Sequence, residues 1–364
     1  MSVPILCLGL SFLCCLFVSA VLFSILSRND FLRSKGLPSS LSILGALIIG
    51  LIPVSLIFWH PYDFVAEISA LQYFFPLILS ILIAGALFFS KPFILPIVII
   101  TSSTLSVFLS GLHINLLPDF PTIINQLLTI VLLSVFALSW RGIAGLNPLP
   151  QIEGITVCIG IFFLYVFGSA PLIMATTASG LGATLIIAYL YSKSQPIGLN
   201  SAPLLGFIIG WLGLIAYDEY IISCYIIFIA FALLEIIISF TRYITLLPQY
   251  REIAYNSVSV QSFSSGLPAA DTIRIIWNTN ILLIILGLFQ SHGSNIYSIP
   301  IFASIITAWQ LYRMSNWQTA SQTLKETNQE LIKEVKKSFS KIFNQEQEKT
   351  SIDNSAKKTK KDKR

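Results

Sequence analysis

The sequence predicts an all-α polytopic membrane protein with about eleven transmembrane helices. Of its 364 residues, 55% are hydrophobic and only 11% are charged, and the mean hydropathy is +0.80. A soluble domain carries about 25% charged residues because its surface must stay wet. The basic and acidic residues balance over positions 1–324, and the whole net charge of +5 lies beyond them. This composition excludes a soluble enzyme, a nucleic-acid-binding domain and a disulfide-stapled secreted domain.

A helix that crosses the hydrocarbon needs about 20 largely apolar residues, because lipid offers no partners for backbone N–H and C=O groups. Eleven stretches of the chain meet this requirement. They are 4–27, 39–59, 68–89, 93–111, 122–140, 152–168, 170–192, 202–217, 219–246, 273–290 and 295–312. The first stretch has no basic residue before it and is long enough to span, so a cleaved signal peptide is not expected.

The basic residues predict the orientation, since Lys and Arg collect on the cytoplasmic side. Odd-numbered connections carry all the Lys and Arg residues up to Arg274, whereas even-numbered connections carry none. The residues on the odd side are Arg28, Arg33, Lys35, Lys91, Arg141, Lys193, Arg242, Arg251 and Arg274. The N-terminus is therefore expected outside, and the C-terminal tail is expected in the cytoplasm.

The chain changes character after the membrane domain, which is predicted to cover residues 1–315. Apolar residues recur at helical spacing between 316 and 347, which predicts a cytoplasmic amphipathic helix with one narrow apolar stripe. The stripe consists of Leu324, Leu331, Val335, Phe339 and Ile342. Residues 348–364 are rich in Lys and poor in apolar residues, so this tail is expected to be disordered. Three interpretations of residues 316–364 remain open. The segment binds a partner protein, it binds an anionic lipid surface, or it has no specific ligand.

The connection between the fifth and sixth predicted spans carries a recognisable pattern. It reads Asn147-Pro148-Leu149-Pro150-Gln151-Ile152-Glu153-Gly154-Ile155-Thr156. This run resembles a degraded Asn-x-x-Asp-Gly-x-Asp-Gly-Ile-Ala, the motif of the polyprenyl-phosphate sugar-1-phosphate transferases. That family includes phospho-N-acetylmuramoyl-pentapeptide transferase and the undecaprenyl-phosphate N-acetylglucosamine-1-phosphate transferases, within bacterial glycosyltransferase family 4.

Four further segments follow in the order of that family, each on or beside a loop expected to be cytoplasmic. The first segment, Gly85–Phe89, resembles the family's Gly-x-x-Asp-Asp motif. The second consists of Ile197–Leu199 and Leu204–Phe207, and it resembles Met-Gly-Asp-x-Gly-Ser-x-x-Leu-Gly-Phe. Glu235 and Arg242 stand for an acid and an Arg seven residues later. Ala254–Gln261, with Gly266-Leu267-Pro268 after it, stands for Ala-His-Arg-x-His-x-x-Gln. The resemblance covers roughly residues 10–290.

The resemblance implies a reaction in which a polyprenyl phosphate oxygen attacks the β-phosphorus of a UDP-sugar and UMP leaves. Such a site holds Mg²⁺ with carboxylates and neutralises the phosphates with basic side chains. At the positions of the family's acids, histidines and arginine this chain carries Phe88, Phe89, Pro150, Leu199, Tyr255, Asn256 and Ser259. Glu153 alone keeps a carboxylate, so we expect no Mg²⁺ cofactor unless transferase activity persists.

The positions that match the family mostly serve architecture, because glycines permit tight turns and close helix contacts. The retained glycines are Gly154, Gly198, Gly206 and Gly266. The resemblance implies that Glu153 and Glu235 are vestigial catalytic candidates. It implies no set of metal ligands. It leaves Asn147, Gly198, Arg242 and Gln261 as candidate substrate-binding residues.

Each single residue also has a structural interpretation. Glu153 is either a relict metal ligand or an interfacial carboxylate favoured by a helix N-terminus. Glu235 lies deep in a predicted span, where an ionisable group suggests function, although a neutral or hydroxyl-bonded glutamate is the alternative. Arg242 lies two helical turns further on, so a direct pair with Glu235 would need a bent helix. Asn278 and Asn280 are expected to bond between helices rather than to bind a ligand.

Three functional hypotheses remain. The first is a pseudoenzyme of the bacterial cytoplasmic (inner) membrane, a lipid-binding or scaffold protein of cell-envelope polysaccharide synthesis that binds polyprenyl phosphate and no nucleic acid. The second is an active transferase with a site rebuilt from other residues. The third is a transporter or flippase, which is disfavoured because the spans hold few ionisable residues and show no inverted repeat.

Overall fold

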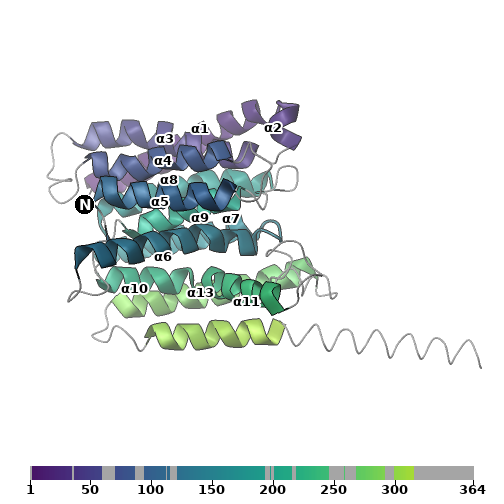
Figure 1. Cartoon of the computed structure of the whole chain (residues 1–364). Coiled ribbons are helices and arrows are strands. Elements are labelled where there is room, and N and C mark those ends of the chain that lie inside the picture. The colour runs from purple at the N-terminus through teal and green to yellow at the C-terminus, as the bar shows by residue number, and fades with distance from the viewer. Residues whose placement is uncertain are drawn as a thin grey trace, which may run out of the picture.

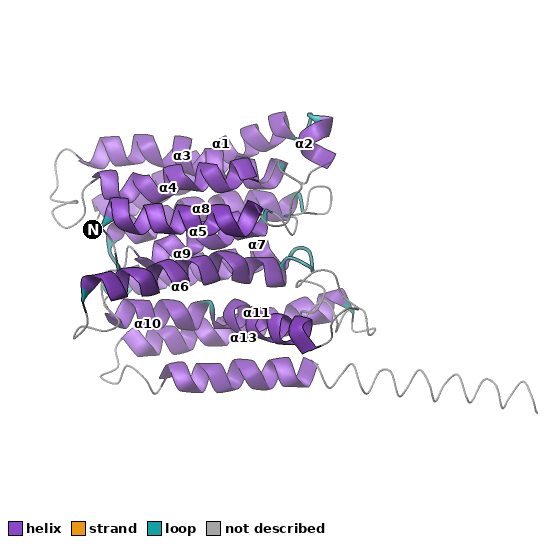
Figure 2. Cartoon of the chain, viewed as in Figure 1, coloured by secondary structure: helices purple, strands orange, loops and turns teal. Residues whose placement is uncertain are grey.

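Every regular element of the described residues is a helix, and the helices run side by side along a common direction (Figures 1 and 2). The computed structural model describes residues 2–34, 37–59, 70–86, 94–111, 113–114, 121–192, 197, 201–214, 219–245, 258, 268–291 and 299–314. The labelled helices are α1 (Ser2–Leu26), α2 (Asp30–Ser34), α3 (Pro38–Trp59), α4 (Ala70–Ala86), α5 (Ile94–Ser110), α6 (Thr122–Ile143), α7 (Leu149–Val166), α8 (Leu172–Leu190), α9 (Ala202–Leu214), α10 (Glu219–Phe228), α11 (Ala230–Thr245) and α13 (Ala269–Ser291). A further helix covers 299–314.

The helices fit an α-helical, multi-pass membrane protein. Five are by themselves long and apolar enough to cross a membrane, and these are Pro4–Leu26, Thr122–Ile143, Leu149–Val166, Leu172–Leu190 and Ala269–Ser291. Shorter apolar helices of 10–17 residues accompany them, such as Ala202–Leu214. Each of the eleven predicted stretches contains described helix, while eleven membrane crossings stay a prediction.

The outer surface of the helices is apolar, as a bilayer requires. On α1, the side chains of Ile5, Leu13, Phe17 and Ile25 are each 60% exposed or more. A soluble protein rarely exposes a continuous apolar surface of this kind. The exposed face of α1 is therefore suited to contact with lipid chains.

Two features of the helices differ from the expectation. The predicted stretch 219–246 is interrupted at Ile229, which separates α10 from α11. The break follows Phe228, whose ring lies where a side chain on Gly160 or Gly287 would otherwise be, so this ring fills the space left by two glycines of other helices. The short helix α2 was not expected, and the Asn29 Oδ1 atom caps it by accepting a hydrogen bond from the Leu32 N–H at 3.2 Å.

The predicted cytoplasmic helix 316–347 and the predicted disordered tail 348–364 lie outside the described residues. The domain boundary near residue 315 therefore stays a prediction.

Helix α9 lies at the centre of the packing. All thirteen of its residues are buried, and its largest contact is with α6. Gly206 allows this contact, because a Cβ atom there would lie 2.6 Å from the backbone oxygen of Phe136 and 2.8 Å from that of Ala137. Small residues let helix backbones approach closely inside a membrane protein.

Helix α7 joins α8 through a tight turn and also packs against α13. The turn contains Gly168 with a φ of +77°, a conformation that costs glycine little and other residues much. Helix α13 in turn packs against α10 and α11. The pair α7 and α13 therefore connects the α8 side of the molecule with the α10–α11 side.

Contacts between helix ends place several basic residues at one end of the bundle. The ring of Phe23, near the end of α1, stacks on Tyr191, after α8, at 4.3 Å. The side chain of Asn147, between α6 and α7, donates to the Ser192 carbonyl at 2.8 Å. Arg274, in the first turn of α13, lines the same cavity as Asn147 and Ser192. The ends that carry Arg28, Arg141 and Arg274 therefore lie together.

The α6–α9 contact makes a direct prediction for Gly206. Gly206→Ala puts a methyl group against two backbone oxygens, so α6 and α9 must separate at a cost of about 1–3 kcal/mol or more. We expect a lower midpoint in thermal unfolding of the detergent-solubilised protein, followed by far-UV circular dichroism. Gly85→Ala in α4 is the matched control, because nothing lies within 4 Å of its added Cβ atom. Equal midpoints for the two variants would contradict the close contact.

Candidate functional site

The segment that resembles the transferase motif forms the beginning of α7. Pro150 lies in the first turn of this helix, where proline is favoured because its missing N–H would have no partner there. Glu153 follows one turn later and its side chain is fully buried. Glu153 therefore lies inside the bundle, close to the N-terminus of α7.

Glu153 is bonded to another helix. The Asn280 Nδ2 group, on α13, donates a hydrogen bond to Glu153 Oε2. The side chain of Asn280 is 1% exposed. This contact confirms the expectation that Asn280 bonds between helices.

The second candidate acid, Glu235, is also buried. It lies on α11 with 0% exposure, and α11, like α7, packs against α13. The backbone carbonyl of Glu235 also accepts a hydrogen bond from Ser239 Oγ at 2.7 Å. Glu153, Glu235 and Asn280 are called the buried acid cluster below.

The buried acid cluster does not fit the Mg²⁺ ion that the transferase resemblance implies. Among the described residues, no group of three or more His, Cys, Asp or Glu side chains is placed to hold a metal ion. Magnesium prefers octahedral oxygen ligands and usually keeps several waters. One oxygen of Glu153 is already bonded to an amide, and the neighbouring turns of α13 carry the buried apolar side chains of Ile276 and Leu283. We derive no reaction step through Mg²⁺ here.

Of the four candidate substrate-binding residues, the structure describes the side chain of Asn147 alone. Asn147 lies between α6 and α7 and donates to the Ser192 carbonyl. Arg242 belongs to α11, but its side chain is not among those that the structure describes. Gly198 and Gln261 lie outside the described residues. A common binding site for these four residues therefore stays a prediction.

The retained glycines Gly154 and Gly206 have architectural roles. A Cβ atom on Gly154 would lie 2.6 Å from the Leu185 side chain of α8, so this glycine lets α7 approach α8. Gly206 lets α9 approach the backbone of α6 in the same way. The other two retained glycines lie outside the described residues.

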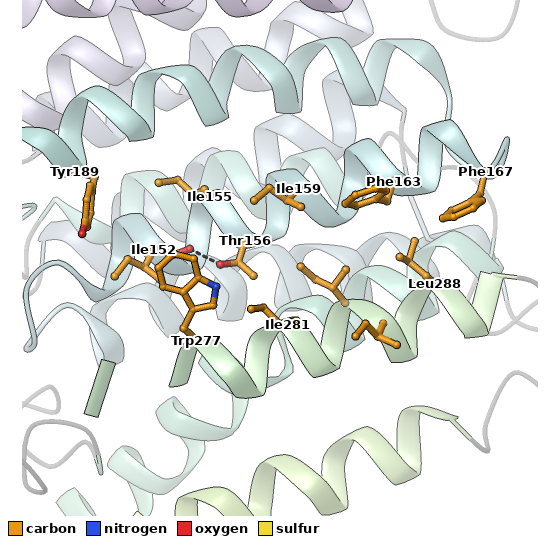
Figure 3. Close-up of a pocket in the computed structure, with 12 residues that line it drawn as sticks. Ile152, Ile155, Thr156, Ile159, Phe163, Phe167, Tyr189, Trp277, Ile281 and Leu288 are labelled. Carbon is orange, nitrogen blue, oxygen red and sulfur yellow. Dashed lines mark hydrogen bonds between the residues drawn. The ribbon is translucent and has the colours of Figure 1, made fainter. Parts of the chain in front are cut away.

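An open apolar cavity of about 590 Å³ lies between α7 and α13. Figure 3 shows the side chains of Ile155, Ile159 and Phe163 on α7 facing those of Ile281 and Leu288 on α13. The cavity lining is almost entirely apolar, and Thr156 Oγ1 is bonded to the Ile152 carbonyl at 2.6 Å. This cavity is suited to a hydrocarbon chain.

A second cavity of about 720 Å³ continues from the first and is more polar. The two cavities share Ile152, Tyr189, Trp277 and Ile281. The polar groups at this end come from Asn147, Ser192, Arg274 and Asn278. Together the two cavities form one amphipathic depression, called the α7–α13 groove below.

The cation of the α7–α13 groove is accessible. The side chain of Arg274 is 75% exposed, and its Nη1 atom lies 3.8 Å from Asp271 Oδ1. An exposed ion pair of this length contributes little, so Arg274 can turn to an anionic ligand at small cost. Tyr189 and Trp277 line the boundary between the polar and apolar parts, where amphipathic rings are favoured.

Sequence reasoning missed Arg274 and Trp277 as groove residues. Arg274 was used only for the orientation, and Trp277 carried no pattern of its own. The signal that could have found them is the spacing of Arg274, Trp277, Asn278 and Ile281. These residues lie three, four and seven positions apart and therefore share one face of a helix.

The bond between Glu153 and Asn280 predicts non-additive mutations. Asn280→Leu leaves a buried carboxyl group without its donor, and we expect a loss of about 1–3 kcal/mol. The double variant Glu153→Leu/Asn280→Leu should lose less than the sum of the two single variants, by about 0.5–2 kcal/mol. Unfolding in SDS, followed by circular dichroism, measures this coupling energy. Strict additivity would show that the two side chains do not interact.

The comparisons with known proteins add no family. No protein-family model matches the chain, and no curated protein matches it. The function is therefore argued from the α7–α13 groove, the buried acid cluster and the resemblance in the sequence.

Proposed function

We propose that this chain is a multi-pass protein of the bacterial cytoplasmic membrane that binds a long-chain anionic lipid without catalysing sugar-phosphate transfer. The single observation that carries the proposal is the α7–α13 groove, with a cationic and amide-rich end and an apolar length. An amphiphile with a phosphate head and one long chain matches this distribution of polarity. The resemblance to the polyprenyl-phosphate sugar-1-phosphate transferases favours polyprenyl phosphate as that amphiphile.

The length of the groove favours a long chain. Its lining runs from Ile152 on α7 to Phe167, the residue after that helix, which corresponds to about 22 Å at 1.5 Å per residue. One leaflet of the hydrocarbon core is about 15 Å thick, half of the usual 30 Å. A polyprenyl chain is long enough to occupy the full groove, whereas an acyl chain of an ordinary phospholipid is confined to one leaflet.

The polar end of the groove supplies the groups that a phosphate needs. Arg274 offers a guanidinium group that can bind phosphate oxygens with two parallel hydrogen bonds. Asn278 is one turn further along α13 and lines the same cavity. An amide offers N–H donors to the remaining phosphate oxygens.

The buried acid cluster supports the non-catalytic part of the proposal. In the transferase reaction, carboxylates must reach Mg²⁺ and phosphate at an accessible site. Here Glu153, which stands at the position of a motif Asp, is buried between helices and bonded to Asn280. Its contact is the kind that stabilises helix packing in a membrane.

The proposed orientation places the N-terminus outside, the C-terminus in the cytoplasm, and eleven spans between them. The gathering of Arg28, Arg141 and Arg274 at one end of the bundle supports this orientation, because cytoplasmic ends carry the excess of Lys and Arg. The phosphate head of the lipid then lies at the cytoplasmic face. Residues 316–364 lie on the same side in this arrangement and are proposed to contact a protein partner of envelope assembly.

Lipid binding is tested with the purified full-length protein by native mass spectrometry. We expect polyprenyl phosphate to bind more tightly than either neutral polyprenol or phosphatidylglycerol. Ile281→Trp fills the groove and should weaken polyprenyl phosphate binding at least about tenfold. Arg274→Gln removes one charge near the membrane surface, worth about 1 kcal/mol, and should weaken it about fivefold while leaving polyprenol binding unchanged.

Ile97→Trp is the matched control for the groove variant. Ile97 lies on α5 with 63% of its side chain exposed, away from the groove. The proposal fails if this control weakens binding as much as Ile281→Trp does, or if phosphatidylglycerol binds as well as polyprenyl phosphate.

The orientation is tested by cysteine labelling in intact cells with a membrane-impermeant maleimide. The five native cysteines lie within helices as free thiols, and wild-type cells measure their background. His292→Cys, in an even-numbered connection, should react from outside. Asp353→Cys should react only after lysis, and its labelling in intact cells would overturn the orientation.

A further inference from the structure

The polar contact between α7 and α13 joins two planar groups, the carboxyl group of Glu153 and the amide group of Asn280. Their side chains are 0% and 1% exposed. The Asn280 Nδ2 group donates to Glu153 Oε2, which uses one polar atom of each group. The other atom of each group, Glu153 Oε1 and Asn280 Oδ1, is buried without a hydrogen-bond partner. The Glu153–Asn280 pair therefore contains two unused oxygen atoms.

One proton satisfies both of these oxygen atoms. An ionised carboxylate can only accept hydrogen bonds, and so can the oxygen of an amide. With Glu153 ionised, both oxygens would remain without a donor, which is strongly unfavourable in a buried site. A protonated carboxyl group carries an O–H donor. With the proton on Oε1, this O–H group can donate to Asn280 Oδ1 and form a second bond beside the first.

No Lys or Arg in the part of the chain that the structure describes forms an ion pair with Glu153. The described cations on the packed helices lie near helix ends. Arg141 belongs to the last turn of α6, and Arg274 lies six residues before Asn280, about 9 Å along α13. The side chain of Arg274 is 75% exposed and lies beside Asp271. Burying an ionised carboxylate without a partner of opposite charge is costly.

The remaining titratable side chains on α7, α13 and the helices packed against them supply no positive charge. Helix α9 has no titratable residue. Those that the structure describes on the other helices are Cys158, Tyr165, Tyr189, Cys224, Tyr225 and Glu235. Each of these side chains is neutral or negative, so none of them favours an ionised Glu153.

We propose that Glu153 carries a proton on Oε1 in the folded protein and donates it to Asn280 Oδ1, so that the α7–α13 contact is a proton-binding site. The acid and the amide then form a cyclic pair with two parallel hydrogen bonds. The pair is neutral, which avoids the cost of burying a charge between the helices. The proposal is independent of lipid binding, because neither Glu153 nor Asn280 lines the α7–α13 groove.

The bound proton links folding to pH. In the unfolded chain, a glutamate releases its proton near its ordinary pKa of about 4.3. The folded protein keeps this proton, so folding takes up one proton at higher pH. The contribution of the pair to stability is therefore complete below about pH 4.3 and decreases as the pH rises, until the folded protein also releases the proton. For one proton, the equilibrium constant for folding falls about tenfold per pH unit.

The test compares wild type with Glu153→Gln over a pH series, using purified full-length protein unfolded in SDS and followed by circular dichroism. The NH₂ group of the glutamine takes the place of the acid O–H group and cannot lose its proton. We expect this variant to be at least as stable as wild type at neutral pH. The ratio of the two folding constants should change about tenfold per pH unit in favour of the variant as the pH rises.

Two control variants separate Glu153 from other acids. Asp30→Asn removes an exposed carboxyl group from α2 and should keep the pH dependence of wild type. Glu235→Gln removes the buried acid of α11. Adding Glu153→Gln to this second variant should have the same effect on pH dependence as adding it to wild type.

A difference infrared spectrum of the folded proteins at about pH 7 detects the proton directly. Subtracting the spectrum of Glu153→Gln from that of wild type should leave the C=O band of a protonated carboxylic acid and no carboxylate band. If Glu153→Gln does not fold, the double variant Glu153→Leu/Asn280→Leu removes the same carboxyl group and replaces it in both measurements.

Three results would overturn the proposal. The first is the same pH dependence in wild type and in Glu153→Gln. The second is a carboxylate band in the difference spectrum, which would show that Glu153 is ionised. The third is a pH dependence that disappears in Glu235→Gln alone, which would assign the proton to Glu235.

Discussion

A polar side chain inside a hydrocarbon layer has no water to bond with, so its partner must come from another helix. The contact between Asn280 and Glu153 meets this requirement between α13 and α7. These two helices are otherwise held by apolar packing, which lipid chains can match. The polar contact therefore fixes the relative position of α7 and α13, and with it the shape of the groove that these two helices form.

Helix α7 presents different residues to its two sides. Glu153 and Gly154 face the interior, where one bonds to α13 and the other lets α8 approach. Ile155, Ile159 and Phe163 face the groove. The segment that resembles a catalytic motif thus contributes helix packing on one side and a lipid-sized surface on the other. Under the proposed function, the residues at the positions of the motif's acids supply no metal chemistry, and the positions that match the motif shape the helix.

The sequence was sufficient for the class of fold, because apolar runs of the required length are local properties. It was insufficient at Ile229, where the break between α10 and α11 follows no Pro or Gly in that stretch. The break instead accompanies Phe228, which packs against Gly160 and Gly287 from distant parts of the chain. Such a contact appears only in three dimensions.

The candidate site was predictable in part for the same reason. Glu153 and Glu235 are unusual as acids in apolar stretches, so both were found from the sequence. The bond between Glu153 and Asn280 depends on how α7 and α13 pack. Arg274 and Trp277 are ordinary interfacial residues in the sequence and become part of a groove only because α7 lies opposite them.

The central claim is that Glu153 stabilises helix packing and takes no part in phosphate chemistry. The most direct test measures UMP release by purified protein that has been shown to bind polyprenyl phosphate, supplied with Mg²⁺ and a panel of UDP-N-acetylhexosamines. The account predicts no release above that of a preparation from cells carrying the empty vector. Release above that background, abolished by both Glu153→Ala and Glu235→Ala, would show a working transferase and contradict it.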